Sequence, residues 1–231
     1  MKYNAILFDL DHTLLDTEQN SRDAMEEVYH YHSFDKYYET FDEFYNVYSA
    51  HNLKMWNAYE KNLATKEDIL NLRFYTPFRH IDSLTPEKSF ELNNEYLDRV
   101  VLKTKVIDGA FDLLNDLKPY FPMHILSNGF NEVQHKKMDS AGLTPYFDNI
   151  ILSDHIGINK PDPALFNYAL RMIGMKPDEV VMVGDNWNSD IIGAKASKID
   201  QVWYNPSQIA PKEFIPTYTV GKLSEVRDIL M

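Results

Sequence analysis

The chain of 231 residues contains no cysteine. This absence excludes disulfides, thiolate catalysis and cysteine-ligated zinc, and it is typical of proteins in the reducing cytoplasm. Basic side chains are also scarce, since 23 Lys and Arg face 35 Asp and Glu and leave a formal net charge of −12. Nucleic-acid binding requires basic side chains that displace counterions, so we expect no nucleic-acid polymer as a partner. An anionic substrate would need cations placed locally at its site.

Long hydrophobic runs are missing as well. No apolar stretch approaches the length of a transmembrane helix. The apolar run near the N-terminus, Ala5–Phe8, is interrupted by Asp9 and is too short for a signal peptide. We therefore expect a soluble, cytoplasmic protein that does not bind membranes. A chain of this length forms one large domain, or a core with an insertion, and can bury a substantial core.

The most informative motif is an apolar strand that ends in two aspartates, Asp9 and Asp11. Side chains two residues apart on a strand point the same way, so a strand that continues to Asp11 places both carboxylates on one side. In an open α/β sheet, ligands bind at this carboxyl edge. Neighbouring carboxylates repel each other, and Mg²⁺ relieves the repulsion because it prefers oxygen ligands. Aspartate is also common in turns, so the motif needs support from elsewhere.

Three later segments repeat this arrangement of strand, polar residues and helix. Ser127 and Asn128 offer a hydroxyl and an amide beside a helix start, which suits phosphate oxygens. Lys160 lies in a loop stiffened by prolines and can present a fixed positive charge to phosphate and carboxylates. Asp185 ends an apolar strand, and Asp190 follows at the start of a helix, where the helix dipole favours an acid. Taken alone, Ser127, Asn128, Lys160 and Asp190 also fit ordinary turn, surface or helix-start chemistry, whereas Asp185 is expected at the edge of the sheet, as Asp9 is.

The pattern along the chain predicts a helical segment inserted into alternating strands and helices. Such alternation indicates an α/β fold with a doubly wound parallel sheet, similar to a Rossmann fold. We predict a catalytic core from residues 1–15 and 106–231, and an all-helical cap from residues 16–105. Two helix starts are clear: Asp162 caps a helix with Pro163 in its first position, and Thr65 caps another.

Taken together, these segments resemble the haloacid dehalogenase-like hydrolase superfamily, in the subclass with a helical cap. The matching residues follow in order along the whole chain: Asp9-x-Asp11-x-Thr13, Ser127, Lys160 and Gly184-Asp185-x-x-x-x-Asp190. A narrower resemblance is to the pyrimidine 5′-nucleotidase branch. It rests on His12, where most relatives carry glycine, and on Trp203-Tyr204-Asn205-Pro206.

The resemblance implies a phosphatase that hydrolyses small phosphate monoesters with Mg²⁺ as its cofactor. Asp9 would be the nucleophile that forms an aspartyl-phosphate. Asp11 would protonate the leaving oxygen and then act as the base for the hydrolytic water. The cation would be held by the Asp9 carboxylate, the Asp11 backbone carbonyl and Asp185.

The resemblance also implies a phosphate-binding set made by Ser127, the backbone of Asn128 and Lys160. The remaining matched residues would have supporting roles: Thr13, Asp190 as the residue that orients Lys160 or water at the metal, and His12. The His12 side chain would form a hydrogen bond to substrate, gate the cap, or act as a structural spacer in a tight loop.

The substrate that we expect from the narrower resemblance is a nucleoside 5′-monophosphate, with a preference for pyrimidines. Aromatic rings in the helical segment could stack on a base, although most of them are expected to form the core of that segment. Other functions stay open: a sugar-phosphate phosphatase, a phosphoglucomutase-type phosphotransferase, a haloacid dehalogenase that uses Asp9 alone, or a non-catalytic binding protein. Asp11 and Asp185 speak against the dehalogenase, because displacing a halide from carbon requires no metal site.

Overall fold

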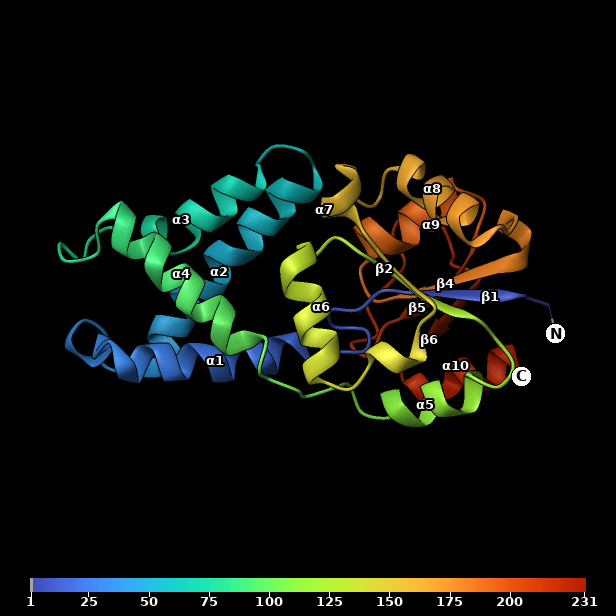
Figure 1. Cartoon of the computed structure of the whole chain (residues 1–231), viewed down its shortest axis with the longest axis horizontal. Helices are drawn as coiled ribbons and strands as arrows, with labels where there is room; N and C mark the ends of the chain where they lie inside the picture. Colours follow the sequence, from blue (N-terminus) through green and yellow to red (C-terminus); the bar gives the residue numbers. More distant parts are fainter. Residues whose placement is uncertain (1) are drawn as a thin grey trace. The chain divides into compact units, whose positions relative to one another are not determined.

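The structure is a computed structural model of the chain and describes residues 2–231. It divides into two compact units (Figure 1). The α/β unit contains Met1–Thr17 and Lys105–Met231, and the helical unit contains Glu18–Thr104. Within the described residues, no helix is long and apolar enough to cross a membrane.

The α/β unit contains a parallel sheet in the order β3-β2-β1-β4-β5-β6. Its strands are β1 (Ala5–Phe8), β2 (Met123–Ser127), β3 (Asn149–Leu152), β4 (Val180–Gly184), β5 (Asp200–Tyr204) and β6 (Tyr218–Val220). Phe8, the last residue of β1, lies opposite Ile125 of β2 and Val183 of β4. The three strands therefore end near the same level, so the polar residues that follow them meet at one edge.

Helices cover both faces of this sheet, which confirms the predicted doubly wound fold. Ile6 and Phe8 face a core that includes α5 (Ala110–Leu117) and α10 (Leu223–Leu230). Ala5 and Leu7 face the opposite core, which includes α8 (Pro163–Ile173) and α9 (Ile192–Ala196). The alternation along β1 thus places apolar side chains on both sides, as in a central parallel strand.

Both predicted helix starts are present in the structure. The Asp162 side chain accepts a hydrogen bond from the Ala164 backbone N–H, 2.8 Å away, at the start of α8. In the helical unit, Thr65 and Asp68 form a reciprocal capping box at the start of α3 (Lys66–Phe78). These caps satisfy backbone groups that the first helical turn leaves without partners.

The helical unit is built from four helices around a core of aromatic rings. Besides α3 these are α1 (Thr17–Tyr31), which begins at the end of the first α/β segment, α2 (Phe41–Glu60) and α4 (Pro86–Val100). The rings of Phe34 and Phe44 stack with centroids 4.7 Å apart, and those of Phe44 and Phe78 with centroids 4.8 Å apart. Aromatic side chains of this unit therefore supply its packing.

The structure differs from the sequence expectation in three places near the sheet edge. Strand β1 ends at Phe8 and does not continue to Asp11. The chain after β3 forms the short helix α7 (Ser153–Ile156), which the sequence did not predict. The Asp154 carboxylate of α7 accepts a hydrogen bond from the Asn131 backbone N–H at the start of α6 (Asn131–Ser140). The segment Trp187–Ile191 is a π-helical turn rather than the start of a regular α-helix.

Candidate active site

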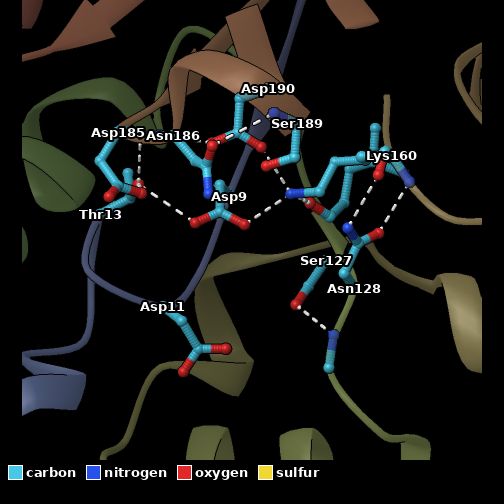
Figure 2. A network of polar contacts seen from close by, with 12 residues as sticks. Asp9, Asp11, Thr13, Ser127, Asn128, Lys160, Asp185, Asn186, Ser189 and Asp190 are labelled. Carbon is cyan, nitrogen blue, oxygen red and sulfur yellow. Dashed lines mark hydrogen bonds and ion pairs between the residues drawn. The ribbon is translucent and has the colours of Figure 1, made fainter. Parts of the chain in front are cut away.

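Lys160 lies at the centre of a buried ion cluster in the α/β unit (Figure 2). Its ammonium nitrogen Nζ lies 2.6 Å from Asp9 Oδ1 and 2.7 Å from Asp190 Oδ1. It also donates a hydrogen bond to the Leu126 carbonyl oxygen, 2.7 Å away. Because an ammonium group has three N–H donors, these acceptors use all of them. The positive charge is therefore fixed beside two carboxylates.

Asn128 holds the loop that carries Lys160. Its side-chain Nδ2 donates to the Lys160 carbonyl oxygen at 3.1 Å, and its Oδ1 accepts from the Lys160 backbone N–H at 2.8 Å. The sequence suggested a backbone role for Asn128 at a phosphate and missed this use of its side chain. The pairing joins positions 32 residues apart, so local sequence patterns carry no signal for it.

Thr13 connects the carboxylates of Asp9 and Asp185. Its hydroxyl Oγ1 lies 3.2 Å from Asp9 Oδ2 and 3.2 Å from Asp185 Oδ1. The same oxygen accepts a hydrogen bond from the Asp185 backbone N–H at 3.1 Å. A hydroxyl has one hydrogen to donate, so it cannot fully satisfy both carboxylate oxygens.

The loop after β4 fixes Asp190 behind Lys160. The Asn186 backbone N–H donates to Asp190 Oδ2 at 3.0 Å, while Asp190 Oδ1 accepts from the lysine. A Cβ at Gly184 would lie 2.4 Å from Asp190 Oδ2, so only glycine permits this close approach. Trp203 on β5 donates from Nε1 to the Asp185 carbonyl oxygen at 2.9 Å and anchors the same loop.

The electrostatics of the cluster are unbalanced toward negative charge. Burial is the main cause that raises the pKa of Asp9 to about 7, with help from the charges of Asp190 and Asp11 and against the effect of Lys160. Burial and the charges of Asp9 and Asp190 also raise the pKa of Asp185 well above its ordinary value. The three acids Asp9, Asp185 and Asp190 are buried or half-buried, and among residues 2–231 Lys160 is the one cation in the cluster. This excess of negative charge favours binding of a further cation.

The donor set fits a divalent metal. One carboxylate oxygen from each of Asp9, Asp185 and Asp190 lies within 4.8 Å of the other two. Both Asp190 oxygens already accept hydrogen bonds, whereas Asp9 Oδ2 and Asp185 Oδ1 share the single hydroxyl hydrogen of Thr13. Asp9 and Asp185 are therefore the carboxylates best able to bind a hard cation such as Mg²⁺.

Asp11 does not lie beside Asp9 as a continued strand would require (Figure 2). The chain leaves the strand at Phe8, and His12 adopts a left-handed conformation with φ of 62°. The Asp11 carboxylate instead accepts hydrogen bonds from Lys137, Thr17 and Gln134. Although burial opposes ionisation, the Lys137 ammonium and these hydrogen bonds hold the pKa of Asp11 well below its ordinary value.

Ser127 has a hydroxyl hydrogen that is available to a ligand. Its Oγ accepts from the Gly129 backbone N–H at 3.1 Å and from Gln134 Nε2 at 2.8 Å. Both partners are donors, so the Ser127 O–H can point at an anion. The sequence missed Gln134 and Lys137, which lie three residues apart on α6. Their spacing on one helix face was the available signal.

His12 lies on the surface of this region. Its side chain is exposed, and its backbone has a positive φ. Histidine adopts the left-handed region more readily than most residues do. The structure therefore supports a conformational role for the residue at this position in the turn after Asp11.

Known proteins are similar to this chain along most of its length. The sequence profile described as haloacid dehalogenase-like hydrolase matches residues 3–198. The chain is 30% identical to the HAD-hydrolase YfnB of Bacillus subtilis, covering 99% of this chain and 96% of that protein. It is also 30% identical to the pyrimidine 5′-nucleotidase YjjG of Escherichia coli, covering 100% of this chain and 99% of that protein.

Solved structures show the same fold. The crystal structure of YfnB bound to magnesium matches with a TM-score of 0.88 at 28% identity, covering 100% of this chain and 99% of that chain. The L-2-haloacid dehalogenase of Xanthobacter autotrophicus matches with a TM-score of 0.73 at 22% identity, covering 99% of this chain and 98% of that chain, which supports the fold alone. With a profile match over most of its length and a similar relative along its whole length, this chain belongs to the haloacid dehalogenase-like hydrolase family of enzymes.

Proposed function

We propose that this enzyme is a Mg²⁺-dependent phosphatase that hydrolyses nucleoside 5′-monophosphates, with a preference for pyrimidines. The observation that carries the proposal is the Asp9 carboxylate, which is buried between Lys160 on one oxygen and Thr13 on the other. This arrangement presents a carboxylate nucleophile in a site where fixed cations can stabilise a phosphoryl group.

Asp9 is the proposed nucleophile. One of its carboxylate oxygens forms a bond to the phosphorus of the ester while the bond from phosphorus to the leaving oxygen breaks. The Ser127 hydroxyl and the Asn128 backbone bind the oxygens of the transferring phosphoryl group, and Lys160 supplies a fixed positive charge beside it. Because Asp190 and the Leu126 carbonyl also hold the lysine, its charge requires little reorganisation during the reaction.

Asp9, Asp185 and the backbone carbonyl of Asp11 are the groups proposed to hold Mg²⁺. The bound ion would supply positive charge that binds the phosphoryl oxygens and keeps the Asp9 carboxylate ionised. The support from this chain is the acidic cluster with one shared hydroxyl donor. The magnesium bound in the YfnB crystal structure is consistent with this assignment.

Asp11 is the proposed acid and base. Because Lys137 and the other donors hold Asp11 as a carboxylate in this structure, it must first take up a proton, which it then gives to the leaving alkoxide as the aspartyl-phosphate forms. In the second step it takes a proton from the water that attacks phosphorus, and the bond between phosphorus and Asp9 breaks to release phosphate. The sum of the two steps is one ester and one water converted to one alcohol and one phosphate.

The substrate preference rests on the relatives. The matches to YjjG and to the pyrimidine 5′-nucleotidase PynA of Streptococcus pneumoniae span the chain at 30% and 28% identity. We propose that the helical unit, which is inserted between β1 and β2, serves as the cap of the enzyme. The action on a small-molecule monoester also agrees with the strong negative net charge of the chain, which disfavours polymeric nucleic acid.

Phosphate release from a panel of monoesters tests the proposal. The panel contains UMP, dUMP, dTMP, AMP, sugar phosphates and p-nitrophenyl phosphate, each with Mg²⁺ and with EDTA. We expect metal-dependent release led by the pyrimidine monophosphates. Release led by sugar phosphates would contradict the substrate, and activity that survives EDTA would contradict the metal.

Asp9→Asn tests the nucleophile in the same assay. The variant keeps the shape of the side chain and removes its charge, so turnover should fall below detection while the circular dichroism spectrum is unchanged. Asp148→Asn, on a carboxylate outside the cluster, is the matched control and should keep wild-type turnover. Substantial turnover by folded Asp9→Asn would remove Asp9 from the proposed role.

A further inference from the structure

We propose that Gln134 is a positioning residue that sets where the Asp11 carboxylate stands relative to the Ser127 hydroxyl. The inference rests on the proposed function, in which Asp11 transfers protons and Ser127 binds phosphate. It adds a residue from α6 that neither the motifs nor the roles proposed above include.

One nitrogen atom of Gln134 joins these two residues. Nε2 donates to Asp11 Oδ2 at 2.5 Å and to Ser127 Oγ at 2.8 Å. A side-chain amide carries two hydrogens on its nitrogen, so both bonds form at the same time. The Gln134 side chain is almost fully buried, with 1% exposure, so water does not compete for these donors. A single nitrogen atom therefore bridges the Asp11 carboxylate and the Ser127 hydroxyl oxygen.

The other oxygen of Asp11 is held from different elements. Oδ1 accepts from Lys137 Nζ on α6 and from Thr17 Oγ1 at the start of α1, each at 2.7 Å. With both oxygens bonded, the carboxylate has little freedom to rotate. Of the three donors, Gln134 is the one that also contacts a proposed phosphate-binding group.

The absence of a side chain at Gly129 leaves the space that the Gln134 amide occupies. A Cβ at Gly129 would lie 2.2 Å from Gln134 Nε2 and 2.3 Å from its Cδ. Gly129 is not among the glycines with positive φ, so its backbone alone does not require glycine. It is the close approach of the Gln134 side chain that requires glycine at position 129. The Gly129 N–H also donates to Ser127 Oγ, so the three residues form one unit.

The consequence for catalysis depends on the leaving group. An alkoxide must receive a proton as its bond to phosphorus breaks, and Asp11 supplies that proton in the proposed mechanism. A nitrophenolate is stable without a proton. Displacement of Asp11 should therefore slow the reaction of a nucleoside monophosphate more than that of p-nitrophenyl phosphate, because proton transfer is sensitive to position.

The test compares kcat/KM for UMP and p-nitrophenyl phosphate with saturating Mg²⁺ in four proteins. These are the wild type, Gln134→Met, Gly129→Ala and Lys136→Met. Methionine fills a similar volume to glutamine without an N–H donor, and Gly129→Ala displaces Gln134 without altering it. Lys136 is an exposed neighbour on α6 and serves as the control.

We expect the ratio of kcat/KM for UMP to that for the aryl ester to fall at least tenfold in Gln134→Met and Gly129→Ala. The ratio should stay at the wild-type value in Lys136→Met. Because both changes act on one contact, the double variant Gly129→Ala/Gln134→Met should show the same ratio as each single variant.

Equal losses for both esters in folded variants would overturn the inference, since Gln134 would then act through phosphate binding or stability alone. Wild-type kinetics for both Gln134→Met and Gly129→Ala would overturn it too. Absence of wild-type turnover of either ester would instead overturn the proposed function and, with it, this role of Gln134.

Discussion

The ammonium of Lys160 lies 2.6 Å from the Asp9 carboxylate and forms a second ion pair with Asp190 at 2.7 Å. Burial alone would lower the pKa of this lysine, but the two carboxylates raise it above its ordinary value. Lys160 therefore stays charged in the folded protein and serves two purposes. It offsets the burial of two acids, and it supplies a fixed cation next to the proposed nucleophile.

Lys160→Met should reduce both activity and stability. The variant keeps most of the apolar stem and removes the fixed positive charge beside the phosphoryl group, so kcat/KM should fall by about 10²–10³-fold. It also leaves the buried acids Asp9 and Asp190 without their cation, which should lower the free energy of unfolding by about 3–5 kcal/mol. Steady-state kinetics and urea denaturation measure the two effects.

Lys136→Met is the matched control, because this lysine is exposed on α6. Its activity should equal that of the wild type, and its free energy of unfolding should change by less than about 0.5 kcal/mol. A Lys160→Met protein with wild-type stability would contradict the buried ion cluster as the structure describes it.

Gly184→Ala should damage the same cluster through steric contact. The added Cβ would lie 2.4 Å from Asp190 Oδ2 and 2.6 Å from its Cγ. Asp190 cannot move away without losing its bonds to Lys160 and to the Asn186 N–H. We expect a loss of about 1–3 kcal/mol in the free energy of unfolding, as for overpacked cores, together with reduced kcat/KM.

Gly221→Ala provides the comparison for this substitution. No atom lies within 4 Å of a Cβ at Gly221, and its φ is not positive. The free energy of unfolding of this variant should stay within about 0.5 kcal/mol of the wild type. If the two alanine variants were equally stable, the close approach of Asp190 to Gly184 would not be a constraint on the fold.

The fold class was predictable because strand and helix patterns alternate strongly along the α/β unit. The same pattern explains why Asp9, Lys160 and Asp185 could be grouped from the sequence. Two of them directly follow the adjacent strands β1 and β4, whose ends meet at one edge of the sheet.

The orientation of Asp11 could not be predicted in the same way. It depends on the turn after Phe8, where His12 has a left-handed conformation, and on donors that α6 brings from more than 120 residues away. Gln134 and Lys137 resemble ordinary surface residues of a polar helix in the sequence. Only the packing of α6 in the α/β unit brings them to Asp11.

Arg73→Met should stabilise the protein. The Arg73 side chain lies in the helical unit with 3% exposure, its Nε has no hydrogen-bond acceptor, and no carboxylate among residues 2–231 forms an ion pair with it. Its guanidinium carbon lies 5.6 Å from the centre of the Tyr96 ring and 5.9 Å from that of Trp56. A desolvated cation–π contact contributes about 2 kcal/mol or more, whereas burial of an ion without an opposite charge costs several kcal/mol.

The free energy of unfolding of Arg73→Met should therefore rise by about 1 kcal/mol or more, measured by urea denaturation. Arg79→Met, at an exposed position after α3, is the control and should have little effect. A large destabilisation by Arg73→Met would show that the guanidinium has a stabilising partner in solution, such as an anion.

The contribution of His124 to stability should fall in mild acid, opposite in sign to that of Asp9, whose raised pKa favours the folded chain as the pH falls below about 7. This histidine is 4% exposed on β2, and its Nδ1 accepts a hydrogen bond from Asn149 Nδ2 at 3.0 Å, which requires the neutral ring. Burial lowers the pKa of His124 below its ordinary value of 6.5, although the charge of Asp148 opposes this. Below about pH 6.5 His124 binds a proton in the unfolded chain but not in the folded chain, so its own contribution to the free energy of unfolding decreases as the pH falls.

Urea denaturation of the wild type and of His124→Gln from pH 7.5 to pH 5 measures this effect. Glutamine cannot titrate, so the free energy of unfolding of the variant minus that of the wild type should increase as the pH falls below 6.5. One proton limits the difference between the two slopes to about 1.4 kcal/mol per pH unit. His135→Gln, on an exposed residue of α6, should follow the wild-type slope. Parallel curves for wild type and His124→Gln would mean that the folded protein accepts a proton on His124 as easily as the unfolded chain, despite its burial between strands.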